Sequence, residues 1–173
     1  MNLAIFASYN ASVLEPILKS GYKVSLIASN NPNSNAIKKA KKYGIASAIV
    51  DENIIQTLKY HDIDTILLAG YMKLIDKKLI QDFPNRIINT HPALLPKYGG
   101  KGMYGINVHK AVIQNKEKQS GVTAHFVNEE YDKGKIILQK SLEIEQTWDE
   151  YDLEKHIKIL EKDVVLEVLK TLS

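Results

Sequence analysis

The chain has 173 residues, of which 45% are hydrophobic and 25% charged, and its formal net charge is +3. This length suits one domain, and the composition is typical of a globular protein rather than a disordered or fibrous one. The sequence contains no cysteine, which excludes disulfides, thiol nucleophiles and cysteine-based metal sites.

Charge and hydropathy narrow the expected partners. Arg86 is the only arginine among 23 basic residues, and these residues are spread along the chain, so we expect no nucleic-acid partner. No apolar run approaches the length of about 18 residues that a membrane span needs, so we expect no membrane partner. The first residues enter a strand pattern without a basic leader, so we expect no signal peptide and a cytoplasmic location.

The first half of the chain alternates short apolar runs with helical patterns. Ser12 and Glu15 have the spacing of a capping box, so the first helix is expected to begin at Ser12 and to end at Gly21. Strands are expected at 3–7, 24–28, 46–50, 64–69 and from 86 onward. Further helices are expected at 35–43, 53–60 and 76–82. This alternation predicts a Rossmann-like, mostly parallel sheet flanked by helices.

The second half has a different pattern. A helix is expected at 105–115, followed by two strands at 121–127 and 135–140 that a turn-rich acidic segment joins as an antiparallel pair. Thr147 and Glu150 have capping-box spacing and predict a helix to about residue 172. Its apolar stripe consists of Leu153, Ile157, Leu160, Val164 and Leu166. The expected fold is therefore α/β, with antiparallel strands near the C-terminus, in a single domain over residues 1–173.

The stretch from Arg86 to Tyr104 carries the strongest functional signal. Asn89 and His91 are two residues apart on an extended backbone, so both side chains leave the same face. Pro92 and Pro96, with several glycines, end regular structure directly after them. A carboxamide and an imidazole are thus expected at the carboxyl end of a strand, where open α/β sheets bind ligands.

The run Asn-Thr-His-Pro-Ala-Leu-Leu-Pro at residues 89–96 resembles the 10-formyltetrahydrofolate-dependent formyltransferases, and the resemblance extends over nearly the whole chain. It is greatest for the branch of that family that acts on glycinamide ribonucleotide in purine biosynthesis. The resemblance implies direct transfer of the formyl group from the cosubstrate 10-formyltetrahydrofolate to the amine of glycinamide ribonucleotide. His91, His125 and Asp132 could hold a metal ion by residue type, but no short-spaced pair of metal ligands is present in the sequence, so we expect no metal.

The resemblance implies Asn89, His91 and Asp132 as catalytic residues. A tetrahedral intermediate needs donors to its oxyanion and a group that moves a proton between nitrogens. Asn89 suits the first task and His91 the second. Asp132, in a turn-rich loop, is expected to orient the His91 ring and raise its pKa. His125 matches a histidine that the family carries beside this pair, although a hydrogen-bonded core histidine would look the same.

The folate site is implied at the end of the fourth expected strand. The pteridine is expected to meet backbone and apolar groups near Leu68, Tyr71 and Met72, with Lys73 where the family usually has arginine. Lysine keeps the charge but lacks the planar fork of arginine. Asn89, His125 and Asp132 complete the set of residues implied to bind the cosubstrate.

The substrate site is implied at the first loop and the last helix. The family binds phosphate at a glycine-rich loop before a helix N-terminus, and Ala11, Ser12 and Val13 stand at that position. Here Tyr9 and Ala11 replace glycines and Val13 replaces asparagine, which we expect to be tolerated if the φ angles are negative. Glu161 matches a family glutamate that holds the amine-bearing substrate, and Lys158 is one turn earlier.

Other interpretations stay open at this stage. The altered first loop is compatible with a different amine, such as an amino sugar, or with a hydrolase that releases formate. A folate-binding module without catalysis is the non-enzymatic alternative. His109 is expected to have a structural or rim role, and His61 and His156 are expected at the surface. The chain is expected to be a monomer or a homodimer.

Overall fold

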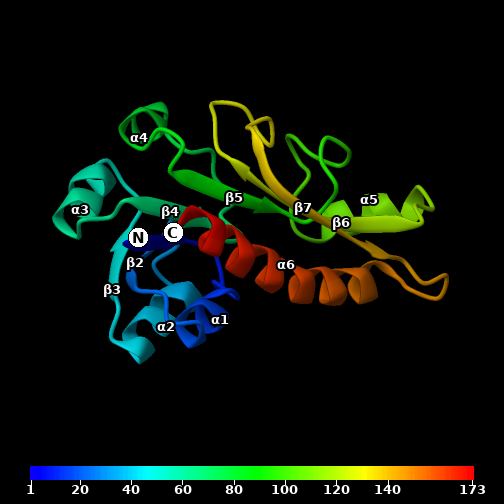
Figure 1. Ribbon diagram of the computed structural model, residues 1–173, viewed down its shortest axis with the longest axis horizontal. Helices are drawn as coiled ribbons and strands as arrows, with labels where there is room; N and C mark the ends of the chain where they lie inside the picture. Colours follow the sequence, from blue (N-terminus) through cyan, green and yellow to red (C-terminus); the bar gives the residue numbers. More distant parts are fainter. The chain divides into compact units, whose positions relative to one another are not determined.

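A computed structural model describes residues 1–173, which form two compact units, residues 1–89 and 90–173. Figure 1 labels the elements. The first four strands are β1 (Leu3–Phe6), β2 (Val24–Ser29), β3 (Ala46–Ile49) and β4 (Thr65–Leu68). They are followed by β5 (Ile87–His91), β6 (Gln119–Phe126) and β7 (Ile136–Glu143). The boundary between the two units falls inside β5, after Asn89.

The strands are hydrogen-bonded in the order β3-β2-β1-β4-β5-β6-β7. Strands β1 to β5 pair in parallel, and β6 pairs with β7 in antiparallel fashion. The predicted fold class, a mostly parallel sheet with antiparallel strands near the C-terminus, is therefore confirmed. None of the helices combines the length and the apolar composition that a membrane span requires.

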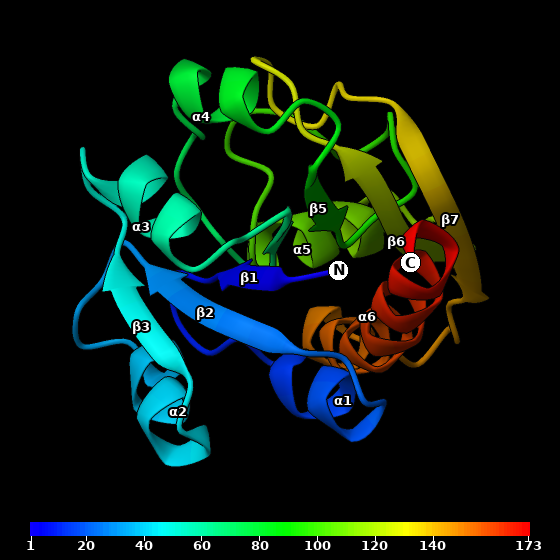
Figure 2. The ribbon, with the colours of Figure 1, turned by 60° about the vertical axis from the view of Figure 1, so that its left-hand side comes forward.

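The first unit is a layered α/β structure. Its helices are α1 (Leu14–Lys19), α2 (Asn35–Tyr43), α3 (Ile54–Tyr60) and α4 (Lys77–Asp82). Figure 2 shows α1 and α2 on one side of β1–β3, with α3 and α4 on the other side. Strands covered on both faces need continuous apolar sequence, and every residue of β1 and β4 is buried.

The N-terminus of α1 differs from the prediction. The N-cap is Val13 instead of Ser12, and no side chain caps the helix. The expected capping box at Ser12 and Glu15 is therefore wrong, because α1 starts one residue too late for the Ser12 hydroxyl to sit at the N-cap. The following helix behaves as expected: the Ser34 hydroxyl caps α2, and Gly44 ends it in the left-handed conformation that glycine favours.

The second unit contains α5 (Ile106–Gln114), the β6–β7 pair and α6 (Glu150–Leu172). Helix α6 packs on both strands and on α5. Its capping box consists of Asp149 and Asp152 rather than Thr147 and Glu150, since Asp149 is the residue whose side chain accepts the first N–H groups of the helix. The C-terminal end of α6 was predicted correctly, whereas the predicted capping box, and with it the start of the helix, was two residues too early.

The buried stripe of α6 also differs in part from the expected one. Leu160 and Leu166 are only partly buried, whereas the stripe is completed by Val165, Val168 and Leu169. Trp148, the single tryptophan, stacks on the ring of His156 with centroids 3.9 Å apart and planes 13° apart. His156 is thus partly covered rather than a free surface residue.

Candidate active site

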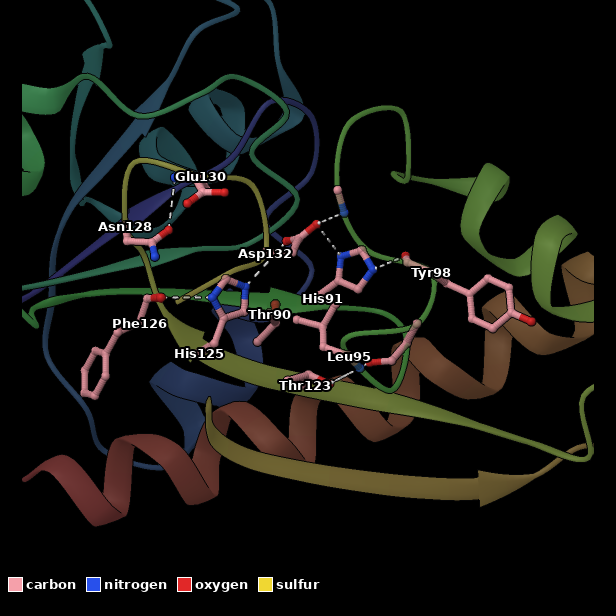
Figure 3. A network of polar contacts seen from close by, with 12 residues as sticks. Thr90, His91, Leu95, Tyr98, Thr123, His125, Phe126, Asn128, Glu130 and Asp132 are labelled. Carbon is pink, nitrogen blue, oxygen red and sulfur yellow. Dashed lines mark hydrogen bonds and ion pairs between the residues drawn. The ribbon is translucent and has the colours of Figure 1, made fainter. Parts of the chain in front are cut away.

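Asp132 lies between two buried histidines, at the centre of the network in Figure 3. Its Oδ2 is 3.5 Å from Nδ1 of His91, and its Oδ1 is 3.5 Å from Nε2 of His125. The Gly100 N–H donates to Asp132 Oδ2 at 2.9 Å. His91 stands on β5, His125 on β6 and Asp132 in the loop between β6 and β7, so residues far apart in sequence meet as predicted.

The outer nitrogen of each ring is fixed by a backbone carbonyl. His91 Nε2 lies 2.7 Å from the Tyr98 oxygen, and His125 Nδ1 lies 2.9 Å from the Phe126 oxygen. A carbonyl can only accept, so these nitrogens carry protons and the other nitrogen of each ring faces Asp132. A proton taken up at His91 Nδ1 would therefore find the carboxylate beside it.

The pKa of His91 is lowered, which contradicts the expected rise. Burial favours the neutral ring, and this effect outweighs the Asp132 charge and the Tyr98 carbonyl, which both raise the pKa. The sequence suggested the carboxylate neighbour but not that the His91 side chain is only 5% exposed. For Asp132, burial alone would raise the pKa, but the His125 and His91 rings and the Gly100 N–H hold it below its usual value.

The loop after His91 is held against β6 and β7 by side-chain hydrogen bonds. The Thr123 hydroxyl donates to the Ala93 oxygen at 2.7 Å and accepts from the Leu95 N–H at 3.1 Å. Gln139 donates to the Thr123 hydroxyl at 2.8 Å and to the Leu95 oxygen at 3.0 Å. These bonds fix the chain that carries the Tyr98 carbonyl and the Gly100 N–H, so the network is pre-organised.

Gly134 closes the Asp132 loop. A Cβ at this position would lie 1.6 Å from the Phe126 oxygen and 3.4 Å from His125 Nδ1. Only glycine allows the backbone to approach that closely. Asp132 itself has a φ of 56°, in the left-handed region that a non-glycine residue seldom adopts. The loop is thus shaped to present the Asp132 carboxylate to both histidines.

The first unit gathers the residues implied to bind folate. Asn89 is partly exposed on β5, opposite Leu68 of β4 in the strand register. The Ser8 hydroxyl accepts from the Met72 N–H at 2.9 Å and donates to Asn30 at 2.7 Å, which joins the loops after β1, β2 and β4. The Tyr71 ring packs edge-on against Phe6, with centroids 5.6 Å apart.

A cavity of about 550 Å³ opens beside these loops. It is lined by Tyr71 and Lys73, both predicted, and by residues that sequence reasoning missed: Asn30, Val50, Asp51, Glu52, Ile54, Ile55, Leu74, Ile75, Asp76, Lys78 and Leu79. These residues come from three separate connections of the chain. No motif joins them, so they give no signal in the sequence.

The implied phosphate loop has an unexpected conformation. Ala11 has a φ of 46°, so the condition of a negative φ, under which the replacement of glycine was expected to be tolerated, is not met at this residue. The loop keeps the left-handed backbone that glycine favours although alanine stands in it. Val13 is completely buried, so its side chain is not exposed to a ligand, whereas Ser12 is partly exposed.

Glu161 and Lys158 both lie on α6. The Thr90 hydroxyl donates to Glu161 Oε1 at 2.7 Å, and Lys158 pairs with Glu154 at 2.8 Å. His109 on α5 is buried, and its Nδ1 has no hydrogen-bond partner, which agrees with a structural role more than with a rim position. No group of three or more acidic, histidine or cysteine side chains is arranged to hold a metal ion.

The match to a protein-family model decides the relationship: the model described as formyl transferase matches residues 1–169. The chain belongs to the formyl transferase family. Its fold agrees with that of a formyltransferase of known structure, the phosphoribosylglycinamide formyltransferase from Streptococcus pneumoniae TIGR4. That structure has a TM-score of 0.89 and 28% identity, and the match covers 99% of this chain and 98% of the other.

Two sequence relatives extend the comparison within the formyl transferase family. The phosphoribosylglycinamide formyltransferase of Bacillus subtilis is 33% identical over 186 residues, covering 98% of this chain and 93% of the relative. The chloroplastic phosphoribosylglycinamide formyltransferase of Arabidopsis thaliana is 38% identical over 158 residues, covering 84% of this chain. The aligned region is 54% of the Arabidopsis protein's length.

Proposed function

We propose that this formyl transferase moves the formyl group of 10-formyltetrahydrofolate to the amine of glycinamide ribonucleotide. The observation that carries the proposal is the Asp132 carboxylate set between His91 and His125, with Asn89 two residues before His91 on β5. Relatives named phosphoribosylglycinamide formyltransferase, one of them aligned over 93% of its length, support this acceptor. The proposal treats residues 1–173 as one formyltransferase domain.

The reaction forms one carbon–nitrogen bond and breaks another. The acceptor amine attacks the formyl carbon, and a tetrahedral intermediate carries negative charge on the formyl oxygen. The bond to N10 of the folate then breaks while a proton passes from the attacking nitrogen to N10. The products are the N-formylated ribonucleotide and tetrahydrofolate, and no covalent enzyme intermediate is required.

Each proposed catalytic residue has a task that follows from its chemistry. The Asn89 amide donates a hydrogen bond to the developing oxyanion. His91 is neutral at pH 7 because its pKa is lowered, so it takes up a proton at Nδ1 only as charge develops. Asp132 faces that nitrogen and stabilises the imidazolium. The Asp132 carboxylate is itself ionised at pH 7, since its pKa is below the usual value.

The remaining assignments concern binding. We propose that Leu68, Tyr71, Met72 and Lys73 contact the folate, with His125 holding Asp132 in place. For the ribonucleotide we propose Ser12 with the backbone of Ala11 and Val13 at the phosphate. Glu161 is proposed to hold the amine-bearing part of the substrate, with Lys158 one turn away. The buried Val13 side chain argues against a direct side-chain role at that position.

One assay tests the proposal against its alternatives. The chain is incubated with 10-formyltetrahydrofolate, with and without glycinamide ribonucleotide, and the deformylated folate is followed by absorbance. Release that requires the amine supports the transferase, release without it indicates a hydrolase, and no release in either case contradicts catalysis. His91→Ala should lower kcat about a hundredfold or more. His61→Ala, at a histidine outside the network, is the control and should leave kcat unchanged.

A further inference from the structure

Thr90 and Glu161 form a hydrogen-bonded pair that the proposed mechanism does not use. The Thr90 hydroxyl donates to Glu161 Oε1 at 2.7 Å, across 71 positions of sequence. Thr90 is the only hydrogen-bond partner of Glu161, so the second carboxylate oxygen is uncommitted. Glu161 as a residue is partly exposed, although its carboxyl group is enclosed enough for burial to raise its pKa.

The place of Thr90 on β5 fixes the direction of its hydroxyl. Side chains alternate along a strand, so Thr90 leaves the face opposite to that of Asn89 and His91. The residue is 7% exposed, and a β-branched side chain has few rotamers. Because the donor is rigid, the carboxylate that accepts from it is held in one orientation.

The hydrogen bond from Thr90 favours the ionised form of the Glu161 carboxyl group against the effect of burial. Burial raises the pKa of Glu161, and the Thr90 hydroxyl, followed by the charges of Lys158 and Lys162, works against this rise. The Lys158 ammonium is shared with Glu154, which lies 2.8 Å away. The hydroxyl is thus the one neutral donor that stabilises the charged carboxylate by direct contact.

We infer that Thr90 is a positioning residue, whose hydroxyl holds one oxygen of Glu161 so that the other receives a hydrogen-bond donor of the ribonucleotide. This inference rests on the proposed function. It links substrate binding to the strand that carries Asn89 and His91. A residue that acts in this way changes how tightly the ribonucleotide is held, and leaves the chemical step nearly untouched.

The test replaces the hydroxyl by a methyl group of similar size. Thr90→Val should raise KM for glycinamide ribonucleotide about tenfold, with kcat and the KM for folate within about twofold, because a hydrogen bond to a charged group is lost. Thr90→Ser restores the donor and should recover most of the affinity. Thr65→Val is the matched control, since the buried Thr65 hydroxyl also donates to a carboxylate, that of Asp64, at 2.7 Å.

A double-mutant cycle separates positioning from a structural effect. In the Glu161→Gln background, Thr90→Val should change the KM for the ribonucleotide by less than about twofold, since the carboxylate that it serves is gone. Should Thr90→Val fold poorly, Thr90→Ala provides the same comparison, with thermal melts measured for every variant. An unchanged KM in folded Thr90→Val overturns the inference and leaves the proposed function intact. A wild-type chain that does not formylate the ribonucleotide overturns the proposed function instead.

Discussion

The Asp132 carboxylate has to stay ionised while it is largely withdrawn from water. Three hydrogen-bond or charge partners achieve this, namely the His91 and His125 rings and the Gly100 N–H. For His91 the effect of burial outweighs that of the neighbouring charge: burial lowers the pKa of the ring more than the Asp132 carboxylate raises it. The result is an acid–base pair in which the carboxylate carries the charge and the imidazole is neutral at rest.

This balance predicts the effect of removing the charge. In Asp132→Asn the pKa of His91 should fall below its value in the wild-type chain, because burial remains and the negative charge that opposed it is lost. The measurement is an NMR titration of the His91 ring protons in both proteins, with His61 as an internal reference. A His91 pKa that is the same in both proteins would mean that the two side chains do not interact in solution.

For the residues of the site, the sequence predicts which side chains take part but not which backbone groups bind them. Asn89, His91 and Asp132 were predicted from a motif, and His91 and Asp132 do meet. The Tyr98 carbonyl and the Gly100 N–H were not predicted, because every residue carries such groups and only the folded loop selects two of them. Thr90 was missed for another reason: its partner Glu161 is 71 positions away, and no local pattern joins them.

Helices were predicted well in extent and less well at their ends. The pattern of apolar residues and glycines placed both ends of α2 and the C-terminal end of α6 correctly, but the start of α6 two residues too early. The caps were missed where several polar residues compete: Asp149 forms the capping box of α6, although Thr147 also has the right spacing. An N-cap aspartate adds a charge that favours the helix N-terminus, which helps explain why Asp149 prevails.

The capping assignment can be tested with a matched pair of substitutions. Asp149→Ala should lower the free energy of unfolding by about 1 kcal/mol, because it leaves two N–H groups of α6 without their acceptor. Thr147→Ala should change it by less than about 0.5 kcal/mol. Urea unfolding at neutral pH measures both. Equal losses in the two variants, or a larger loss for Thr147→Ala, would contradict the box at Asp149 and Asp152.

For the molecule as a whole, the alternation of strands and helices was enough to predict the fold class. It could not predict the cavity beside Tyr71 and Lys73, since its lining comes from connections whose residues have no shared motif. It also did not show that His109 is buried with Nδ1 unpartnered. Whether a single polar side chain is buried depends on how helices and strands pack together. A hydropathy pattern describes whole segments and does not predict the burial of one residue.

His109 makes the stability of the whole chain depend on pH. Burial lowers the pKa of His109 from 6.5 to about 4. The charge of Glu154 opposes this effect, whereas Lys158, and the His91 ring where it is protonated, add to it. Between pH 4 and pH 6.5, His109 is therefore protonated in the unfolded chain and neutral in the folded chain. The stability contribution of the neutral ring is complete above about pH 6.5 and is lost as the pH falls toward 4.

The expected outcome is a loss of about 2 kcal/mol in the free energy of unfolding between pH 7.5 and pH 5 from this residue alone. His109→Leu should remove that part of the pH dependence, and it also removes an unsatisfied buried nitrogen. Urea unfolding at both pH values measures the difference, with His61→Leu as the control. If His109→Leu and the wild-type chain lose the same free energy on acidification, the His109 ring is not held neutral in the fold.

The stack of Trp148 on His156 gives the molecule a built-in optical reporter. Only one indole contributes to the emission of the chain, and it lies against a histidine in the second turn of α6. Fraying of these turns would separate the two rings and change the fluorescence, without any label. The start of the helix that carries Lys158 and Glu161 can therefore be followed in real time, on the unmodified protein, while ligands are added.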